Sequence, residues 1–239
     1  MRECFERTER LLGDDAMERL WGATVLLVGL GGVGGSALET LVRAGVGKIV
    51  AVDADTVSVS NSNRQYLATQ ETLGRKKTEV ARERALSISP DMRLIPVDLF
   101  VGAENAETLI DTYHPYLILD AIDTMSAKIA LITAAAARGI PYLACASTGN
   151  RLDPTRLRIT DLSETHTCPI CRVLRRELKK KGVEHLAVVW SDEPPMTPRV
   201  TPEEHGRHIP ASAPFVPPAA GILMARWAVL TLIHEKETL

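Results

Sequence analysis

Aromatic residues and cysteines are scarce in this sequence. Aromatic residues make up 4% of the 239 residues, so a broad surface on which many nucleic-acid bases stack is not expected. Four cysteines are too few for a disulfide scaffold and favour a reducing compartment. The formal net charge is only -2, from 28 basic and 30 acidic residues, which excludes nucleic-acid binding by bulk charge.

A long apolar run is also missing. The longest run, residues 221–233, contains Arg226 and is shorter than the roughly 20 residues that a membrane span requires. The first 15 residues are charged throughout and have no apolar core followed by small residues, unlike a signal peptide. The sequence therefore predicts a cytoplasmic protein without a membrane segment.

Short β-branched runs alternate with segments of helical length over the first 150 residues. Strands are predicted at residues 24–28, 48–52, 93–97, 116–120 and 142–147, and helices at 32–43, 75–88, 104–112 and 126–138. Such alternation is typical of parallel crossovers. It predicts an α/β fold with a doubly wound, Rossmann-like, mostly parallel sheet, whose nucleotide-binding core is residues 1–150.

The rhythm changes after residue 150. Residues 151–239 are predicted to form an α/β extension of the same sheet, so that residues 1–239 make a single domain. Its expected elements are strands at 156–161 and 186–190, a helix at 169–181 and an apolar helix after Pro218. Eight of the 14 prolines lie between Pro194 and Pro218, which predicts a long, exposed crossing loop without regular structure.

A glycine pattern follows the first predicted strand and opens a helix. It reads GxGxxG, with glycines at Gly29, Gly31, Gly32 and Gly34. Glycine permits the tight turn and lets backbone N–H groups approach a phosphate, while the helix N-terminus adds partial positive charge. Asp53 ends the second strand 19 residues after Gly34, where a carboxylate can accept hydrogen bonds from ribose hydroxyls. The pattern predicts nucleotide binding, and packing glycines are the alternative.

Further polar groups follow the strands of this half. They are Ser60-Asn61-Ser62-Asn63-Arg64-Gln65, Gly74-Arg75-Lys76-Lys77 and Asp120-Ala121-Ile122-Asp123. Open α/β sheets bind ligands at the carboxyl ends of their strands. Two cations, amide side chains and a carboxylate suit a triphosphate with Mg²⁺ better than a nicotinamide, for which no proton-transfer partner is evident. Each group alone is also typical of a solvated helix start or a turn.

In order along the chain, these motifs resemble those of the ubiquitin-activating-like (ThiF-type) adenylyltransferases. The matching segments are Arg7-Thr-Glu-Arg10, Gly29–Gly34, Asp53-Ala-Asp55, Asn63-Arg64-Gln65, Gly74-x-x-Lys77 and Asp120-x-x-Asp123. The resemblance implies that ATP is held by the glycines and by Asp53, Asp55, Asn61, Asn63, Arg64, Gln65, Lys77 and Asp123. It also implies that Asp123 serves Mg²⁺, that Arg64, Lys77 and Asp123 are catalytic, and that a catalytic Arg10 reaches into a partner's site in a homodimer.

A narrower resemblance covers residues 149–156, 168–180 and 215–221. These segments are similar to the tRNA threonylcarbamoyladenosine dehydratases within that superfamily. The family implies an ATP-dependent cyclisation of threonylcarbamoyladenosine in tRNA, through adenylation of the threonyl carboxylate. Activation of the C-terminus of a small ubiquitin-like sulfur-carrier protein is the alternative, and a nucleotide-binding regulatory protein is a third. A monovalent cation and a sulfur-transfer protein partner stay open.

The cysteines separate these branches. Residues 191–218, the predicted crossing loop, contain no cysteine, which argues against an activator that forms a thioester. Cys168-x-x-Cys171 is the sole CxxC pair, and one pair does not complete a tetrahedral zinc site. A site made of His166 and the two cysteines stays open, although coincidence is the simpler interpretation.

A basic segment follows this cysteine pair. Its cations are Arg172, Arg175, Arg176, Lys179, Lys180 and Lys181. Residues 165–190 carry six basic and two acidic groups, a charge of +4 that leaves about -6 on the rest of the chain. Apolar residues at every fourth position predict an amphipathic helix. The resemblance favours a contact of Arg172, Arg175, Arg176, Lys179 and Lys180 with the tRNA backbone, and a solvated face is the alternative.

Overall fold

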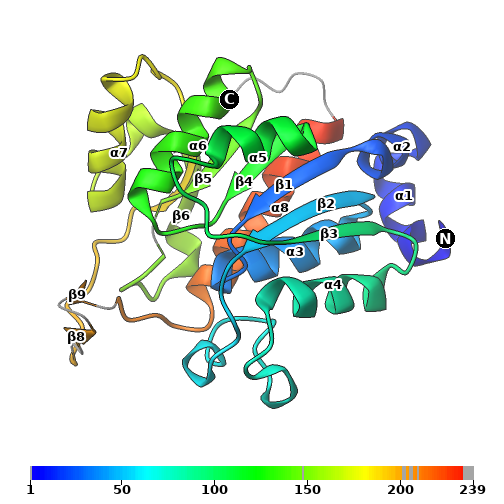
Figure 1. Ribbon diagram of the computed structural model, residues 1–239, viewed down its shortest axis with the longest axis horizontal. Helices are drawn as coiled ribbons and strands as arrows, with labels where there is room; N and C mark the ends of the chain where they lie inside the picture. Colours follow the sequence, from blue (N-terminus) through cyan, green and yellow to red (C-terminus); the bar gives the residue numbers. More distant parts are fainter. Residues whose placement is uncertain (1, 147, 201–202, 205–206, 209, 234–239) are drawn as a thin grey trace.

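The computed structural model describes residues 2–146, 148–200, 203–204, 207–208 and 210–233, and its seven-stranded sheet has the order β3-β2-β1-β4-β5-β7-β6 (Figure 1). The strands are β1 Thr24–Val28, β2 Lys48–Asp53, β3 Arg93–Asp98, β4 Leu117–Asp120, β5 Tyr142–Cys145, β6 Leu157–Asp161 and β7 Ala187–Ser191. All neighbours are parallel except β6 and β7. The predicted doubly wound, mostly parallel fold is confirmed. The strand predicted at 142–147 ends earlier, and Ser147 lies outside the described residues.

Helices cover both faces of the sheet, as Figure 1 shows. One face carries α2 (Asp14–Gly22), α3 (Gly32–Ala44), α4 (Lys77–Ile88) and α8 (Val216–Ile233); the other carries α5 (Ala106–Tyr113), α6 (Met125–Ala137) and α7 (Pro169–Lys179). Leu27 points into the first core and Leu26 into the second, because successive side chains of a strand alternate between faces. The central strands therefore need apolar residues at every position, and this produced the continuous runs that identified them.

The N-terminal segment holds helices that the sequence pattern did not predict. They are η1 (Arg2–Phe5), α1 (Glu6–Leu12) and α2 (Asp14–Gly22). Helix α1 has no buried residue, so it lacks the apolar face on which a prediction from periodicity depends. In Figure 1 these helices lie at the opposite end of β1 from the glycine turn.

Residues 151–233 extend the same sheet, as predicted. Strand β7 pairs with β5, and α8 packs along α3. One expectation for the crossing loop is wrong: it contains a short hairpin, β8 (Glu203–Glu204) and β9 (Arg207–His208). No proline lies between residues 203 and 209, so nothing in that stretch removes a backbone donor from the ladder. Residues 201–202, 205–206 and 209 of the loop lie outside the described residues.

Helix α8 begins earlier than predicted, with two prolines in its first turn, where their missing N–H groups cost no hydrogen bond. It is the described helix that is long and apolar enough to cross a membrane, and 56% of that stretch is buried within the protein. The close approach of α8 to α3 depends on Gly221: a Cβ there would overlap Ser36 Oγ and the carbonyl oxygen of Val33. Burial against α3 is the environment of a core helix.

Replacement of Gly221 by alanine tests this contact. We expect Gly221→Ala to lower the free energy of unfolding by about 2 kcal/mol or more, because the added methyl group overpacks the α3–α8 interface. Gly22→Ala is the matched control, since a Cβ at Gly22 meets no atom within 4 Å. That change should be neutral or stabilise by up to about 1 kcal/mol. Urea unfolding with equal m-values measures both, and equal effects of the two changes would contradict the packing argument.

Candidate nucleotide site

The strand order of the sheet reverses between β1 and β4, since β2 and β3 lie on one side of this point and β5 on the other. Val28 is level with Val52 of β2 on one side and with Asp120 of β4 on the other. The chain leaves β1 toward one face and β4 toward the other, and ligands bind where such strand order reverses. A cavity of about 360 Å³ opens at this edge. Ten predicted residues line it: Gly29, Gly31, Gly32, Asp53, Asp55, Asn61, Arg64, Gln65, Lys77 and Asp123.

The glycine turn forms the floor of the cavity. Gly29 has φ +94°, and a Cβ there would lie 2.8 Å from the carbonyl oxygen of Ala121. Gly31 precedes the first turn of α3 without a side chain that caps it, so the N–H groups of that turn are available to an anion. Asp53 Oδ2 accepts the Leu30 N–H at 2.7 Å and thereby fixes the turn.

Asp53 therefore has a second task besides the predicted one. Its Oδ1 accepts the N–H of Asp55 at 2.8 Å, so both oxygens already bind backbone donors. A carboxylate has about four acceptor positions, which leaves room for the ribose hydroxyls that the sequence suggested.

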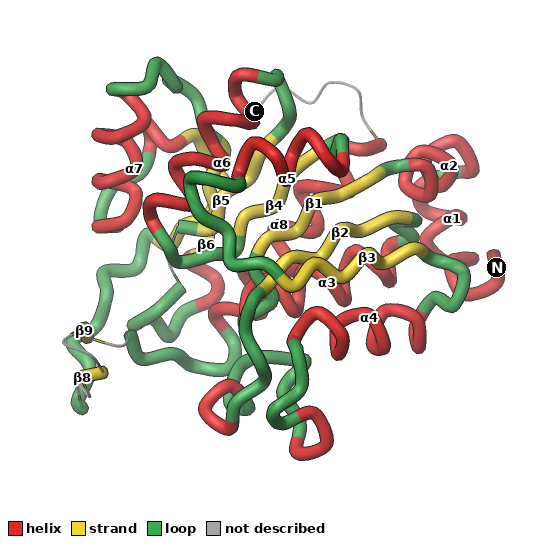
Figure 2. Tube along the Cα trace, in the orientation of Figure 1, coloured by secondary structure: helices red, strands yellow, loops and turns green. Residues whose placement is uncertain are grey.

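Lysine and arginine supply the positive charge of the cavity. Lys77, the first residue of α4, is 4% exposed, and its Nζ lies 2.8 Å from Asp55 Oδ2 and 3.9 Å from Asp53 Oδ1. The adjacent Lys76 points to Asp98 instead, with 40% of its side chain exposed. Arg64 Nη1 donates to the carbonyl oxygen of Ser60 at 2.9 Å. Figure 2 shows the long loop between β2 and α4; Arg64 and Lys76 belong to this loop, and Lys77 opens α4.

Three predicted residues lie away from the cavity wall. Gly34 packs within α3, where a Cβ would overlap the carbonyl oxygen of Gly29, so its role is to bring the helix close to the turn. Asn63 Nδ2 donates to the carbonyl oxygen of Ser212 at 3.1 Å, which ties the loop after β2 to the crossing loop. Arg10 lies on α1, 74% exposed and 2.5 Å from Glu6.

Asp120 and Asp123 have different environments. Asp123 is exposed in the loop after β4, at the cavity wall. Asp120 is fully buried: Lys128 Nζ lies 2.7 Å from its Oδ2, and the Tyr142 hydroxyl donates to the same oxygen at 2.7 Å. Burial, together with the Asp120 charge, holds the pKa of Tyr142 well above its usual value, so the phenol keeps its proton and donates.

Two parts of this region were missed by sequence reasoning. Lys128 is 1% exposed in α6, and its signal was a lone lysine inside an apolar helical run. Leu99, Phe100 and Val101 follow β3 and line an apolar side of the cavity, although Phe100 is 65% exposed. They could have been found from their place in the chain, because they directly follow β3, and the carboxyl ends of parallel strands lie at the same edge of the sheet as Asp53.

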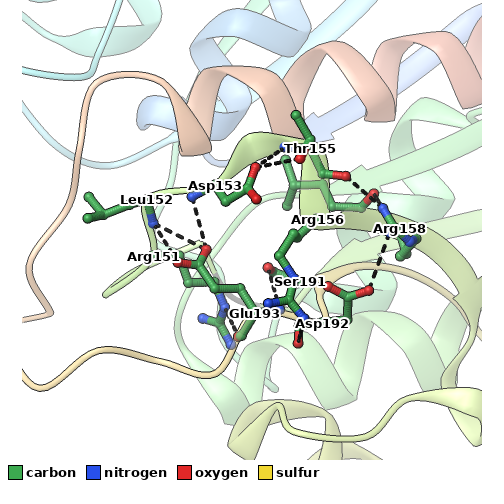
Figure 3. A network of polar contacts seen from close by, with 10 residues as sticks. Arg151, Leu152, Asp153, Thr155, Arg156, Arg158, Ser191, Asp192 and Glu193 are labelled. Carbon is green, nitrogen blue, oxygen red and sulfur yellow. Dashed lines mark hydrogen bonds and ion pairs between the residues drawn. The ribbon is translucent and has the colours of Figure 1, made fainter.

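The crossing loop starts from a network of polar contacts drawn in Figure 3. The Glu193 carboxylate accepts the N–H groups of Leu152 and Asp153 at 3.0–3.2 Å. Arg156 lies 2.6 Å from Asp192, and its hydrogen bond lowers the pKa of that carboxyl group. The network holds the residues after β7 against the segment before β6.

Asn150 also holds the crossing loop, through hydrogen bonds with two of its residues. Its carbonyl oxygen accepts the N–H of Met196 at 2.8 Å, and its Oδ1 accepts the N–H of Ala211 at 2.8 Å. One residue thus holds two points of the chain that lie 15 positions apart, on either side of the β8–β9 hairpin.

The cysteine pair is buried at the start of α7, with Cys168 2% and Cys171 0% exposed. A hydrogen bond from Cys171, helped by backbone N–H groups, lowers the pKa of Cys168 against the opposing effect of burial, and the same contact raises the pKa of Cys171. His166 packs edge-on against Trp190 at 4.7 Å between ring centroids. No group of three potential metal ligands occurs among the described residues, so the structure does not support the His166–cysteine zinc site.

The basic segment forms α7, as predicted. Arg172, Arg176, Lys179 and Lys180 are exposed, and Arg176 and Lys180 both contact Glu177. Arg175 is different, because its Nη1 donates to the carbonyl oxygens of Leu162 and Thr165 at 3.0 and 2.6 Å. Its guanidinium therefore fastens α7 to the preceding turn, and the other five cations of the basic segment, Lys181 included, are exposed.

Comparison with known proteins shows where this geometry belongs. Residues 5–238 match the model of the ThiF family. The chain belongs to the ThiF family. The resemblance seen in the motifs is thereby confirmed, and the match spans both the nucleotide-binding core and the C-terminal extension of this ThiF-family chain.

Relatives within the family cover this ThiF-family chain to different extents. The tRNA threonylcarbamoyladenosine dehydratase of Bacillus subtilis (strain 168) is 36% identical over 244 aligned positions, 98% of this chain and 96% of the relative. The crystal structure of the E. coli dehydratase TcdA in complex with ATP has a TM-score of 0.88 at 32% identity, over 97% and 94% of the two chains. The molybdopterin-synthase adenylyltransferase of Salmonella typhimurium is 38% identical over 52% of this chain and 53% of its own length.

Proposed function

We propose that this chain is an ATP-dependent tRNA threonylcarbamoyladenosine dehydratase that acts as one ThiF-type domain. The observation that carries the proposal is the gathering of Arg64, Lys77 and Asp123 around the glycine turn, at the reversal of strand order. The similar dehydratases extend over nearly the whole chain, including the C-terminal extension, whereas the match to the molybdopterin-synthase adenylyltransferase stops at about half.

The cavity suits ATP in charge and in shape. Free N–H groups of the glycine turn, Lys77 and Arg64 offer donors to a triphosphate, and the wall formed by Leu99, Phe100 and Val101 offers apolar surface to a base. Lys77 Nζ lies 2.8 Å from Asp55 Oδ2, and we infer that it turns to a phosphate oxygen when ATP binds. Asn61 and Gln65 complete the polar side of the wall.

The chemistry needs little more than alignment and charge stabilisation. The threonyl carboxylate attacks the α-phosphorus of ATP, and pyrophosphate leaves. The neighbouring carbamoyl group then attacks the activated carbonyl carbon, and AMP leaves with the former carboxylate oxygen. Overall, the substrate loses the elements of one water molecule, and ATP is converted to AMP and pyrophosphate. Alignment lowers such a barrier by about 7–11 kcal/mol, and a fixed donor adds about 3–4 kcal/mol.

No protein nucleophile takes part in this sequence of bonds. Burial raises the pKa of Cys145 to about 12, and Cys168 and Cys171 are covered by the fold. We propose that Arg64 and Lys77 stabilise the charge on the α-phosphoryl group of ATP during its transfer. Asp55 and Asp53 contact Lys77 and position it for this role.

The donor set fits a magnesium ion that is carried by ATP. Asp123 is exposed at the wall, while Asp53 and Asp55 already bind N–H groups or Lys77. Mg²⁺ prefers one or two carboxylates together with phosphate oxygens and water, and it rarely uses a cage made wholly of protein groups. When bound, it would neutralise phosphate charge. We propose Asp123 as its protein ligand.

A pair of neighbouring lysines tests the proposal. With tRNA that carries threonylcarbamoyladenosine, the protein should form cyclised nucleoside, AMP and pyrophosphate in equal amounts. Lys77→Met should reduce turnover about 100-fold or more, since it removes the buried cation of the cavity, while Lys76→Met should stay within about twofold. Mass spectrometry of tRNA nucleosides and pyrophosphate release are the measurements.

The alternative activity predicts a different outcome of the same assay. Adenylation of a carrier protein that ends in Gly-Gly, with pyrophosphate release that does not respond to tRNA, would replace the dehydratase by a carrier activator. Tight NAD binding without pyrophosphate release would favour a regulatory or dinucleotide-using protein.

We also propose that the enzyme is a homodimer in which Arg10 completes the site of the partner. Arg10 does not line the cavity of its own chain, and its helix α1 lies at the opposite end of β1 from the glycine turn (Figure 1). Its sole ion pair among the described residues is the i,i+4 contact with Glu6, which is worth little in water. A helix at the molecular edge with an outward cation suits delivery to a second copy.

Mixed dimers test this arrangement. Arg10→Ala and Lys77→Met should each be inactive alone, yet co-expression in equal amounts should restore about a quarter of wild-type activity, because half of the dimers are mixed and each has one intact site. A mixture of Lys77→Met with Asp123→Asn is the control and should stay inactive, since both changes damage the chain's own cavity. Equal activity in the two mixtures would contradict a shared site.

We propose that α7 contacts the phosphate backbone of tRNA. Arg172, Arg176 and Lys179 of α7 and Lys180 directly after it face solvent, and Lys181 beside them is also exposed. The rest of the chain is acidic, so these cations concentrate attraction for a polyanion in one place. Arg175 contributes by holding α7 in position. Because the proposed substrate is tRNA, we propose that the enzyme is located in the cytoplasm. The monovalent cation and the sulfur-transfer partner stay predictions on which no contact of the described residues bears.

Salt dependence tests the role of α7. Arg172→Gln/Lys179→Gln should weaken tRNA binding and lower the slope of log K against log salt by about 1.5–2, because two phosphate contacts are lost. The control is Arg43→Gln/Arg84→Gln, which removes the same charge from two exposed arginines that contact Glu39. Its slope should equal that of the wild-type protein. Equal slopes for both double variants would place tRNA elsewhere.

A further inference from the structure

A buried ion pair lies directly beneath the nucleotide cavity. Asp120, the last residue of β4, and Lys128 of α6 are 0% and 1% exposed, and Lys128 Nζ lies 2.7 Å from Asp120 Oδ2. Replacing such a pair by apolar groups of similar size is often neutral or stabilising, because burial removes both charges from water. Stability alone therefore does not account for a lysine in the middle of an apolar helix.

Two further contacts of the pair lead to the edge of the sheet where the cavity opens. Lys128 Nζ also donates to the carbonyl oxygen of Cys145, the last residue of β5, at 3.1 Å. Asp120 Oδ1 accepts the N–H of Ile122 at 3.1 Å. One ammonium group thus joins the ends of β4 and β5, and its carboxylate partner holds the loop that leaves β4.

That loop, residues 121–124, forms part of the cavity wall and carries Asp123. Its first residue, Ala121, donates its N–H to the Val28 carbonyl oxygen at 2.8 Å, and its own carbonyl oxygen faces Gly29. The N–H of Lys128 donates to the Thr124 carbonyl oxygen at 3.0 Å and closes the other end of the loop. Lys128 therefore contacts the end of the loop through its backbone and its start through Asp120.

We propose that Lys128 is a positioning residue, which through Asp120 and the Cys145 carbonyl holds the 121–124 loop and Asp123 at the wall of the nucleotide cavity. Tyr142 assists by donating to Asp120. The proposal rests on the proposed function for the role of Asp123 toward Mg²⁺ and ATP. A functional group held by a rigid, fully hydrogen-bonded support keeps its geometry better than one on a free loop.

A double variant separates positioning from charge neutralisation. Lys128→Met leaves the Asp120 carboxylate buried without its cation, so it should lower the unfolding temperature and weaken binding of Mg·ATP at least tenfold. Asp120→Asn/Lys128→Met removes both charges and should recover the unfolding temperature, while binding of Mg·ATP stays at least fivefold weaker than in the wild-type protein. In EDTA, the same double variant and the wild-type protein should bind ATP within about twofold of each other, because the loss concerns the metal ligand.

Isothermal titration calorimetry without tRNA, combined with thermal unfolding, measures these effects. Arg138→Met is the matched control, because Arg138 directly follows the same helix, α6. The variant loses an ion pair with Asp111, as Lys128→Met loses one with Asp120, but this pair lies at the surface and outside the cavity lining. It should bind Mg·ATP as the wild-type protein does. Should the double variant not fold, Tyr142→Phe decides, because it keeps both charges and should weaken Mg·ATP binding two- to fivefold.

Two results would overturn the inference. One is a double variant that recovers wild-type Mg·ATP affinity together with its unfolding temperature, since the pair would then only neutralise itself. The other is wild-type affinity in Tyr142→Phe. A wild-type protein that binds no ATP would overturn the proposed function instead, and a protein that binds Mg·ATP normally but does not cyclise tRNA would leave the role of Lys128 intact.

Discussion

The cavity depends on one close approach, between Gly29 at the end of β1 and the carbonyl oxygen of Ala121 after β4. The two strands are neighbours, yet the chain leaves them toward opposite faces, and the cavity lies between the departing segments. A side chain at Gly29 would push the β4 loop outward. Asp53, at the end of β2, fixes the glycine turn by accepting the N–H of Leu30.

Charge is organised around this contact in two layers. Lys77 and Arg64 face the cavity, and Asp55 and Asp53 keep Lys77 within reach of it. Below them, Asp120 and Lys128 neutralise each other out of contact with water. The first layer lines the cavity, where a bound phosphate would compete for Lys77 and Arg64, whereas the buried layer has no such competitor. A site built this way combines cations that face the cavity with a buried support beneath its wall.

The C-terminal extension adds what a nucleotide-binding core lacks. Asn150 and Glu193 fasten the crossing loop at its base, and Asn63 joins it to the loop after β2, which lines part of the cavity. Helix α7 is held against the preceding turn by Arg175 while its other cations face outward. The extension thus connects the proposed ATP site to a surface suited to a polyanion, which is consistent with the dehydratases matching the chain over nearly all of its length.

The sequence by itself determined the strands and the doubly wound class of the core, the glycine turn and most of the cavity wall. These follow from local signals: apolar runs mark buried strands, GxGxxG marks the turn, and parallel strands bring their carboxyl ends to one edge. Only the tertiary structure decided that Gly34 serves packing, that Asn63 holds the crossing loop and that Arg175 binds backbone carbonyls. It also showed Lys128 beneath the cavity and Phe100 beside it. The physical reason is that a pattern fixes which way a residue faces, whereas the partner it meets comes from a distant segment and exists only once the chain has folded.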